Sequence, residues 1–140
     1  AASRDRGINI CAHIILGLPG ESRRQMLETA DAVAGLGIQG VKLHLLYVVR
    51  GTPLAVLYRQ GGYRCLDQQA YVDLVCDFIE RLPESMIIHR LTGDPHPREL
   101  IAPMWALQKR DTMQRIDQRF VDRQTWQGRR YGGDPTDRVF

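Results

Sequence analysis

Side chains capable of acid–base chemistry alternate with apolar ones along two stretches of the chain. Residues 8–16 contain His13 among isoleucine, alanine and leucine, and residues 41–49 carry Lys42 and His44 between valine and leucine. Because successive side chains of a strand point to opposite faces, each stretch predicts a strand with one apolar face. On neighbouring parallel strands, the opposite faces would share four polar residues: Asn9, His13, Lys42 and His44.

This polar surface has two interpretations. Parallel strands that are buried on both sides usually read as continuous apolar runs, and these two strands do not. Their polar face therefore meets either solvent at an open sheet or a polar ligand inside a barrel-like interior. In the second case His44 could act as an acid, a base or a hydrogen-bond donor, and Lys42 could pair with a carboxylate or phosphate. Two histidines without a third ligand do not make a metal site, so we predict none.

A glycine-containing loop, Gly-Leu-Pro-Gly-Glu at residues 17–21, joins the first strand to a helix. Glycines let backbone approach a ligand, and helix N-termini favour anions. The loop is neither a Walker loop nor a G-x-G-x-x-G motif. Its spacing is equally typical of a plain turn between a strand and a helix and of a ligand-binding loop.

The three cysteines are scattered and form no local metal motif. Cys11, Cys65 and Cys76 include no C-x-x-C or C-x₃-C pair, so neither a zinc nor an iron–sulfur motif is encoded by their spacing. Three unpaired thiols suit a reducing compartment, and we predict a cytoplasmic protein. We expect the cysteines to occupy strand, loop and core positions.

Helices are predicted between and after the two strands. Ser22 and Gln25 fit a capping box that opens a helix to about residue 34, giving a β-α-β unit with parallel strands. Other elements follow from caps and apolar stripes, while residues 102–107 stay unassigned. They are helices over residues 52–60, 67–82 and 109–124 and a third strand over 86–91.

Length and composition exclude several classes of protein. The chain has 140 residues, whereas a closed eight-stranded barrel takes about 250. Hydrophobic residues are 44% and charged residues 25%, which is ordinary globular composition. No apolar run approaches the ~18–20 residues of a membrane span, so we expect no membrane partner. The charged start without Met leads us to expect a piece of a longer chain.

The positive charge of the chain is concentrated near its end. The formal net charge is +3, and residues 109–140 hold eight basic and five acidic side chains, which accounts for the whole excess. Such a segment is either a solvated helix of mixed charge or a surface that faces RNA or phosphate.

Five segments, taken in order, resemble the C-terminal part of radical S-adenosylmethionine enzymes, and in particular the YhcC-like family, relatives of the Elongator catalytic subunit. They are His-Ile-Ile-Leu-Gly-Leu-Pro-Gly-Glu at 13–21, Val-Lys-Leu-His-Leu-Leu-Tyr-Val-Val-Arg-Gly-Thr-Pro-Leu at 41–54, Ile-His-Arg-Leu-Thr-Gly-Asp at 88–94, Leu-Ile-Ala-Pro at 100–103 and Thr-Trp-Gln-Gly at 125–128. The ordered set is far more specific than the Leu-Pro-Gly-Glu loop alone.

The resemblance implies an α/β fold: the C-terminal part of a partial (β/α)₆ barrel with a mostly helical accessory region. The barrel part would cover residues 1–60, the accessory region 61–128 and a flexible tail 129–140. In this family a [4Fe–4S] cluster cleaves S-adenosylmethionine to a 5′-deoxyadenosyl radical, which takes a hydrogen from the substrate.

The resemblance also implies roles for individual residues. The backbone around Ile15, Leu16 and Gly17 would lie along the adenine of the cofactor, flanked by Leu46 and Tyr47. Four side chains would face the substrate or border its cavity: Lys42, His44, Arg90 and Asp94.

The cluster motif of the family, C-x₃-C-x₂-C, is absent from this sequence. Cys11 cannot replace it, because three thiolates must converge on one cluster. The parent protein is then expected to be a radical S-adenosylmethionine enzyme, while this chain alone holds no cluster and is inactive. Its partner would be the N-terminal half of the barrel, which leaves an exposed sheet edge near residues 8–16. The alternative is an accessory module that binds tRNA through the arginine-rich helix.

Overall fold

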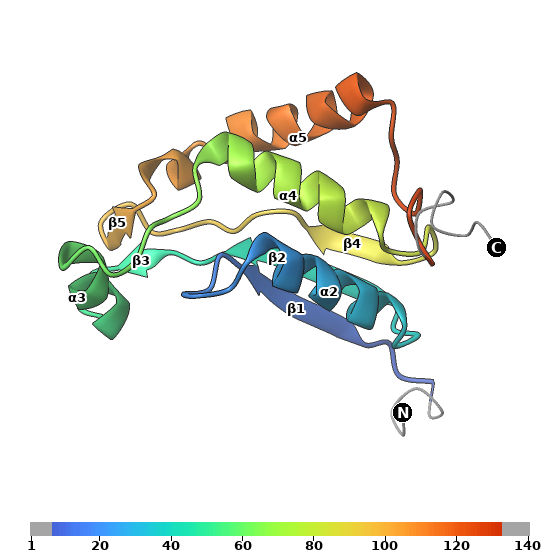
Figure 1. The fold of residues 1–140 in the computed structure, drawn as a ribbon, viewed down its shortest axis with the longest axis horizontal. Helices are drawn as coiled ribbons and strands as arrows, with labels where there is room; N and C mark the ends of the chain where they lie inside the picture. The colour runs from blue at the N-terminus through green and yellow to red at the C-terminus, as the bar shows by residue number, and fades with distance from the viewer. Residues whose placement is uncertain (1–6, 133–140) are drawn as a thin grey trace.

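A computed structural model describes residues 7–132 of the chain, and most of the predicted tail, residues 133–140, lies outside this range. Three parallel strands form the main sheet in the order β1-β2-β4 (Figure 1). They are β1 (Cys11–Leu16), β2 (Gly40–Leu45) and β4 (Ile87–Arg90). The predicted parallel pairing of the first two strands is confirmed, and β1 lies at one edge of the sheet.

The helices begin where their caps predicted. The Ser22 side chain accepts from the Gln25 backbone and completes a capping box for α2 (Arg23–Ala34). Thr52 caps α3 (Pro53–Arg59), and Asp67 caps α4 (Gln68–Glu80). The last helix, α5 (Lys109–Arg123), follows a short 3₁₀ helix, η1 (Met104–Leu107). No helix among residues 7–132 is long and apolar enough to cross a lipid bilayer.

The predicted strand over residues 41–49 is wrong as a single element. It breaks after Leu45, and Val48–Val49 (β3) pairs antiparallel with β5 (Leu100–Ala102) in a separate two-stranded sheet. The break is explained by burial, because Val48 is fully buried in a second small apolar cluster with Ala55, Tyr63 and Ala102. The unassigned stretch 102–107 contains the end of β5 and the helix η1.

One main hydrophobic core joins the sheet to the helices. The buried side of the sheet contributes Leu16, Val41 and Leu43, and α2 and α4 pack on it from the same side. α5 stacks on α4 and adds Ile116 to this core (Figure 1). Side chains from before and after residue 60 therefore share one core, and the boundary between a barrel part and an accessory region stays a prediction.

A layer of ion pairs joins α4 to α5. Arg123 Nη1 lies 2.6 Å from Asp77 and 3.1 Å from Glu80, whose side chain is almost fully buried. Arg119 Nε lies 2.7 Å from Asp73, one turn earlier on the same pair of helices. Because Glu80 also accepts from Thr125, removal of one partner would leave a desolvated carboxylate poorly compensated.

The substitution Arg123→Ala is expected to lower the free energy of unfolding by about 1–3 kcal/mol, because it removes two charge-assisted hydrogen bonds from poorly solvated carboxylates. Urea denaturation measures the loss. The matched control is Arg115→Ala, which breaks an exposed pair with Asp111 on one helix and should cost only about 0–0.5 kcal/mol. Equal losses in the two variants would contradict the assigned ion-pair layer.

Candidate functional site

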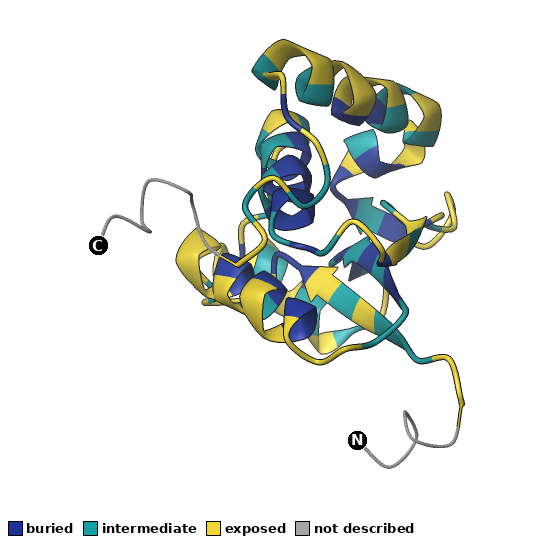
Figure 2. Cartoon of the chain, turned by 90° about the vertical axis from the view of Figure 1, so that its right-hand side faces the viewer, coloured by how far each residue is buried: buried dark blue, intermediate teal, exposed yellow. Residues whose placement is uncertain are grey.

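The face of the sheet opposite the helices carries the predicted polar residues of β1 and β2. In the register of the two strands, His13 lies beside Lys42, and Ile15 lies beside His44. The imidazole rings of His13 and His44 stack with centroids 5.8 Å apart. Exposed and partly buried residues alternate along β1, as the banded strand near the N-terminus shows (Figure 2). The shared polar surface is therefore confirmed for His13, Lys42 and His44, while Asn9 lies before β1; we call this surface the open face.

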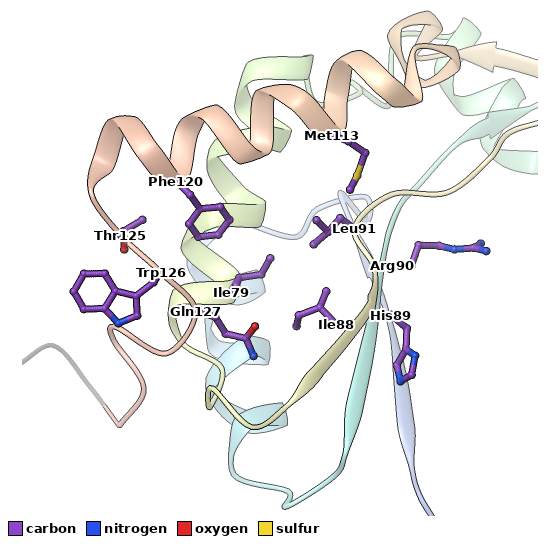
Figure 3. Close-up of a pocket in the computed structure, with 10 residues that line it drawn as sticks. All are labelled: Ile79, Ile88, His89, Arg90, Leu91, Met113, Phe120, Thr125, Trp126 and Gln127. Atoms are coloured by element: carbon purple, nitrogen blue, oxygen red, sulfur yellow. The ribbon is translucent and has the colours of Figure 1, made fainter.

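A bulge in β4 brings two more basic residues to the open face. Val41 pairs with Ile88, but the next residue of β2, Lys42, pairs with Arg90, so His89 is the extra residue. A Cβ placed on Gly40 would lie 2.6 Å from His89 Nε2, which puts the imidazole over the open-face side of β2. Figure 3 shows His89 and Arg90 directed away from the apolar side chains of the helices. Sequence reasoning missed His89.

The open face is electropositive. Burial, followed by the positive charges of Arg90, His13 and Lys42, holds the pKa of His44 below its ordinary value. Among the described residues, Lys42 and Arg90 form no ion pair with a carboxylate.

The predicted site residue Asp94 forms its ion pair with Lys109 rather than with a basic residue of the open face. Its carboxylate lies 2.8 Å from the ammonium group of Lys109. Lys109 and Arg90 both hold the pKa of Asp94 low, the hydrogen bond from Lys109 being the larger cause.

Beyond the end of β2, the backbone at Gly93 lies close to the side chains of Tyr47 and His44 at the border of the open face. A Cβ on Gly93 would lie 2.7 Å from Tyr47 Oη and 3.2 Å from His44 Nδ1, so only glycine fits between them. The Tyr47 hydroxyl is inaccessible to solvent and has no well-formed hydrogen bond among the described residues. Burial raises the pKa of Tyr47, which keeps this hydroxyl protonated. Tyr47 and His44 therefore converge at one point of the face.

The residues predicted to flank the adenine have different surroundings. Ile15 is 45% exposed and belongs to the open face, whereas the Leu16 side chain is buried in the core on the helix side. Gly17 has a φ of +89°, and its carbonyl accepts a hydrogen bond from the Tyr63 hydroxyl. Leu46 packs on the second small cluster. For Leu16 and Gly17, only backbone atoms remain to meet a ligand.

Cys11 shares the open-face side of β1 with His13, whereas the other two cysteines lie on other elements. Cys76 is fully buried in α4, where burial raises its pKa to about 12, and burial also raises the pKa of Cys65. Within residues 7–132, no three histidine, cysteine or acidic side chains are grouped as metal ligands. The described residues therefore do not fit a [4Fe–4S] cluster, which needs several converging thiolates.

An apolar groove of about 460 Å³ lies on the helix side of β4 (Figure 3). Ile79, Met113 and Phe120 form much of its wall. Two of its polar side chains are hydrogen-bonded within the chain, since Gln127 donates to two backbone carbonyls and Thr125 donates to Glu80, while the side chains of His89 and Arg90 point away from it. The groove offers packing surface rather than chemistry.

The arginine-rich segment gives little support to an RNA-binding surface. Arg115, Arg119, Arg123 and Arg130 all pair with carboxylates of α4 or α5. Arg129 lies over the Trp126 ring, 5.6 Å from its centroid. Because most of these charges are compensated within the chain, the alternative of an RNA-binding module stays a prediction without support from the geometry.

Comparison with known proteins settles the family. The model of the Radical_SAM C-terminal domain matches residues 38–122. The chain belongs to the radical SAM family. The match includes β2, β4 and α4 and most of α5, whereas β1 and α2 lie before the matched range.

Relatives confirm the expected resemblance to YhcC-like and Elongator-related proteins. The chain is 45% identical over 126 residues to the uncharacterized protein YtqA of Bacillus subtilis, covering 90% of this chain and 39% of YtqA. It is 31% identical over 130 residues to YhcC of Escherichia coli K12, covering 93% of this chain and 42% of YhcC. The chain thus spans about two fifths of the length of these relatives.

The fold also has a solved counterpart. An archaeal Elp3 from Methanocaldococcus infernus superimposes with a TM-score of 0.74 at 13% identity, over 89% of this chain and 29% of that one. At this low identity the likeness shows a shared α/β fold with a parallel sheet.

The titration of His44 tests the charge of the open face. We expect the pKa of His44 to lie below 6.5 and to rise in Arg90→Ala, because the substitution removes a neighbouring positive charge. Burial, the larger cause, remains, so the rise is partial. Since the unfolded chain binds this proton more readily, His44 makes the fold less stable as pH falls below 6.5. NMR titration of the imidazole resonances measures the pKa.

Arg110→Ala is the control for this titration, because Arg110 is an exposed residue of α5 and is not among the groups that act on His44. An unchanged His44 pKa in Arg90→Ala, or an equal rise in the control, would contradict the assigned proximity of Arg90.

Proposed function

We propose that this chain is the cofactor- and substrate-facing part of a radical S-adenosylmethionine enzyme. The observation that carries the proposal is the open face: a parallel sheet of a radical SAM family member with helices on one side and polar side chains on the other. In open and closed α/β sheets, ligands bind near the carboxyl ends of the parallel strands. Ile15 and His44 lie toward that end of β1 and β2.

The family supplies the cofactors of the proposal. S-adenosylmethionine and a [4Fe–4S] cluster provide the radical chemistry when both are bound to the whole protein. This chain would contribute binding and orientation. The exposed Ile15 side chain and the backbone at Gly17 and Leu46 would border the nucleoside, while Lys42 and His44 would face the substrate.

The cluster ligands would come from the rest of the parent protein. The described cysteines do not converge, and the relatives are about two and a half times as long as the matched region. The edge strand β1 would pair with the preceding part of the sheet, since its outer backbone groups form no ladder with another described strand. Closure by those strands would also shield the open face from water.

A chimera tests this function. Replacing the matching region of B. subtilis YtqA with this chain exploits their 45% identity over 126 residues. With reconstituted iron and sulfide under reducing conditions, both YtqA and the chimera are expected to release 5′-deoxyadenosine from S-adenosylmethionine. The isolated chain is expected to bind no stoichiometric iron and sulfide and to release no 5′-deoxyadenosine.

Three outcomes would contradict the proposal. They are a YtqA without this activity, a folded chimera that loses it, and a stoichiometric cluster on the isolated chain. Arg110→Ala in the chimera serves as a control that should keep the activity, because Arg110 lies on the exposed side of α5.

A further inference from the structure

We propose that the open face binds a phosphate group of the substrate. The inference rests on the proposed function, because it names the chemical class of the substrate at that same site. It depends on three observations: two fixed positive charges without carboxylate partners, imidazoles gathered around them, and a buried hydroxyl that converges on the same end of the face.

The fixed charges lie next to each other on neighbouring strands. Lys42 on β2 is the register partner of Arg90 on β4. Two adjacent cations repel each other, and Asp94, whose pKa Arg90 helps to lower, is hydrogen-bonded to Lys109. A dianionic phosphate would compensate both charges, whereas a carboxylate carries only one negative charge. Arginine and lysine are also the side chains that most often bind phosphate oxygens.

Three imidazoles surround this pair of charges. His13 is the register partner of Lys42 on the other side, and its ring stacks on that of His44. His89 of β4 is directed to the same side of the sheet as Arg90 (Figure 3). Imidazole N–H groups donate hydrogen bonds to phosphate oxygens in either protonation state of the ring. In a regular strand, His89 would pair with Lys42 on this side and Arg90 would turn to the core, so the bulge is what adds Arg90 to the same face.

The end of the face supplies a buried hydroxyl, whose contacts to Thr92 and Gly93 are weak. The Tyr47 hydroxyl is buried without a well-formed hydrogen bond among the described residues and approaches the same point as His44 Nδ1. A buried hydroxyl with only weak hydrogen bonds is costly, so a ligand oxygen reached at this end would be favoured. Gly93 keeps that approach open, since any side chain there would collide with Tyr47.

The test is a titration of the chain with inorganic phosphate at constant ionic strength, followed by NMR of the histidine side chains. The resonances of His13, His44 and His89 are expected to shift together, and the pKa of His44 is expected to rise on binding, because an adjacent anion favours the imidazolium form. Lys42→Ala and Arg90→Ala should each weaken phosphate binding at least about tenfold. Arg110→Ala removes the same charge from α5 and should leave binding unchanged.

Several outcomes would overturn the inference. They are the absence of histidine shifts with phosphate, an equal loss of binding in Arg110→Ala, and acetate that binds as tightly as phosphate, which would assign the face to a carboxylate. Circular dichroism of each variant confirms that it is folded.

The two proposals fail separately. Release of 5′-deoxyadenosine by the YtqA chimera together with no phosphate binding would overturn the substrate class alone. Phosphate binding that depends on Lys42 and Arg90, in a chimera without S-adenosylmethionine cleavage, would overturn the radical function alone.

Discussion

The structure depends on one constraint: the helices pack on a single face of a parallel sheet. Apolar burial stabilises that face strongly, so Leu16, Val41 and Leu43 must point to it. The period of two then forces the intervening residues, His13 and Lys42 among them, to the opposite face. The polar surface is thus a direct consequence of where the helices lie, and its location is fixed by the same burial that stabilises the fold.

Charge in this molecule is divided between two very different environments. In the outer layer, Arg119 and Arg123 of α5 form ion pairs with acidic residues of α4. Their positive charge is therefore compensated within the chain and links the two helices. On the open face, Lys42 and Arg90 have no such match among the described residues. The net charge of the chain, concentrated in residues 109–140, is therefore a poor guide to where an anion would bind. The uncompensated charge lies on the sheet.

Local sequence signals predicted the elements that depend on local physics. These signals act over a few residues, and the structure reproduces them. They are the capping box at Ser22 and the alternation of polar and apolar side chains around His13, Lys42 and His44. The break of the strand after Leu45 was not predictable from local sequence. Val48 is buried in a small apolar cluster whose other members come from later parts of the chain.

The β4 bulge and the ion pairs of α5 could not be predicted for a related reason. A bulge is a property of the pairing of two strands, so the short run around His89 carries no signal for it. The pairing of Arg123 with Asp77 joins residues 46 positions apart in the sequence, and only the packing of the two helices brings them together. Without that knowledge, the arginines of α5 resemble a free basic surface.

The most direct measurement of the central claim, that the open face is the ligand side of the sheet, is a backbone amide NMR map of the chain titrated with 5′-deoxyadenosine. We expect the largest shifts at the ends of β1 and β2, around Ile15, Gly17, Leu46 and Tyr47, with α2 and α5 unaffected. Shifts confined to the helices or to the apolar groove around Phe120, or no shifts at saturating nucleoside, would contradict the account.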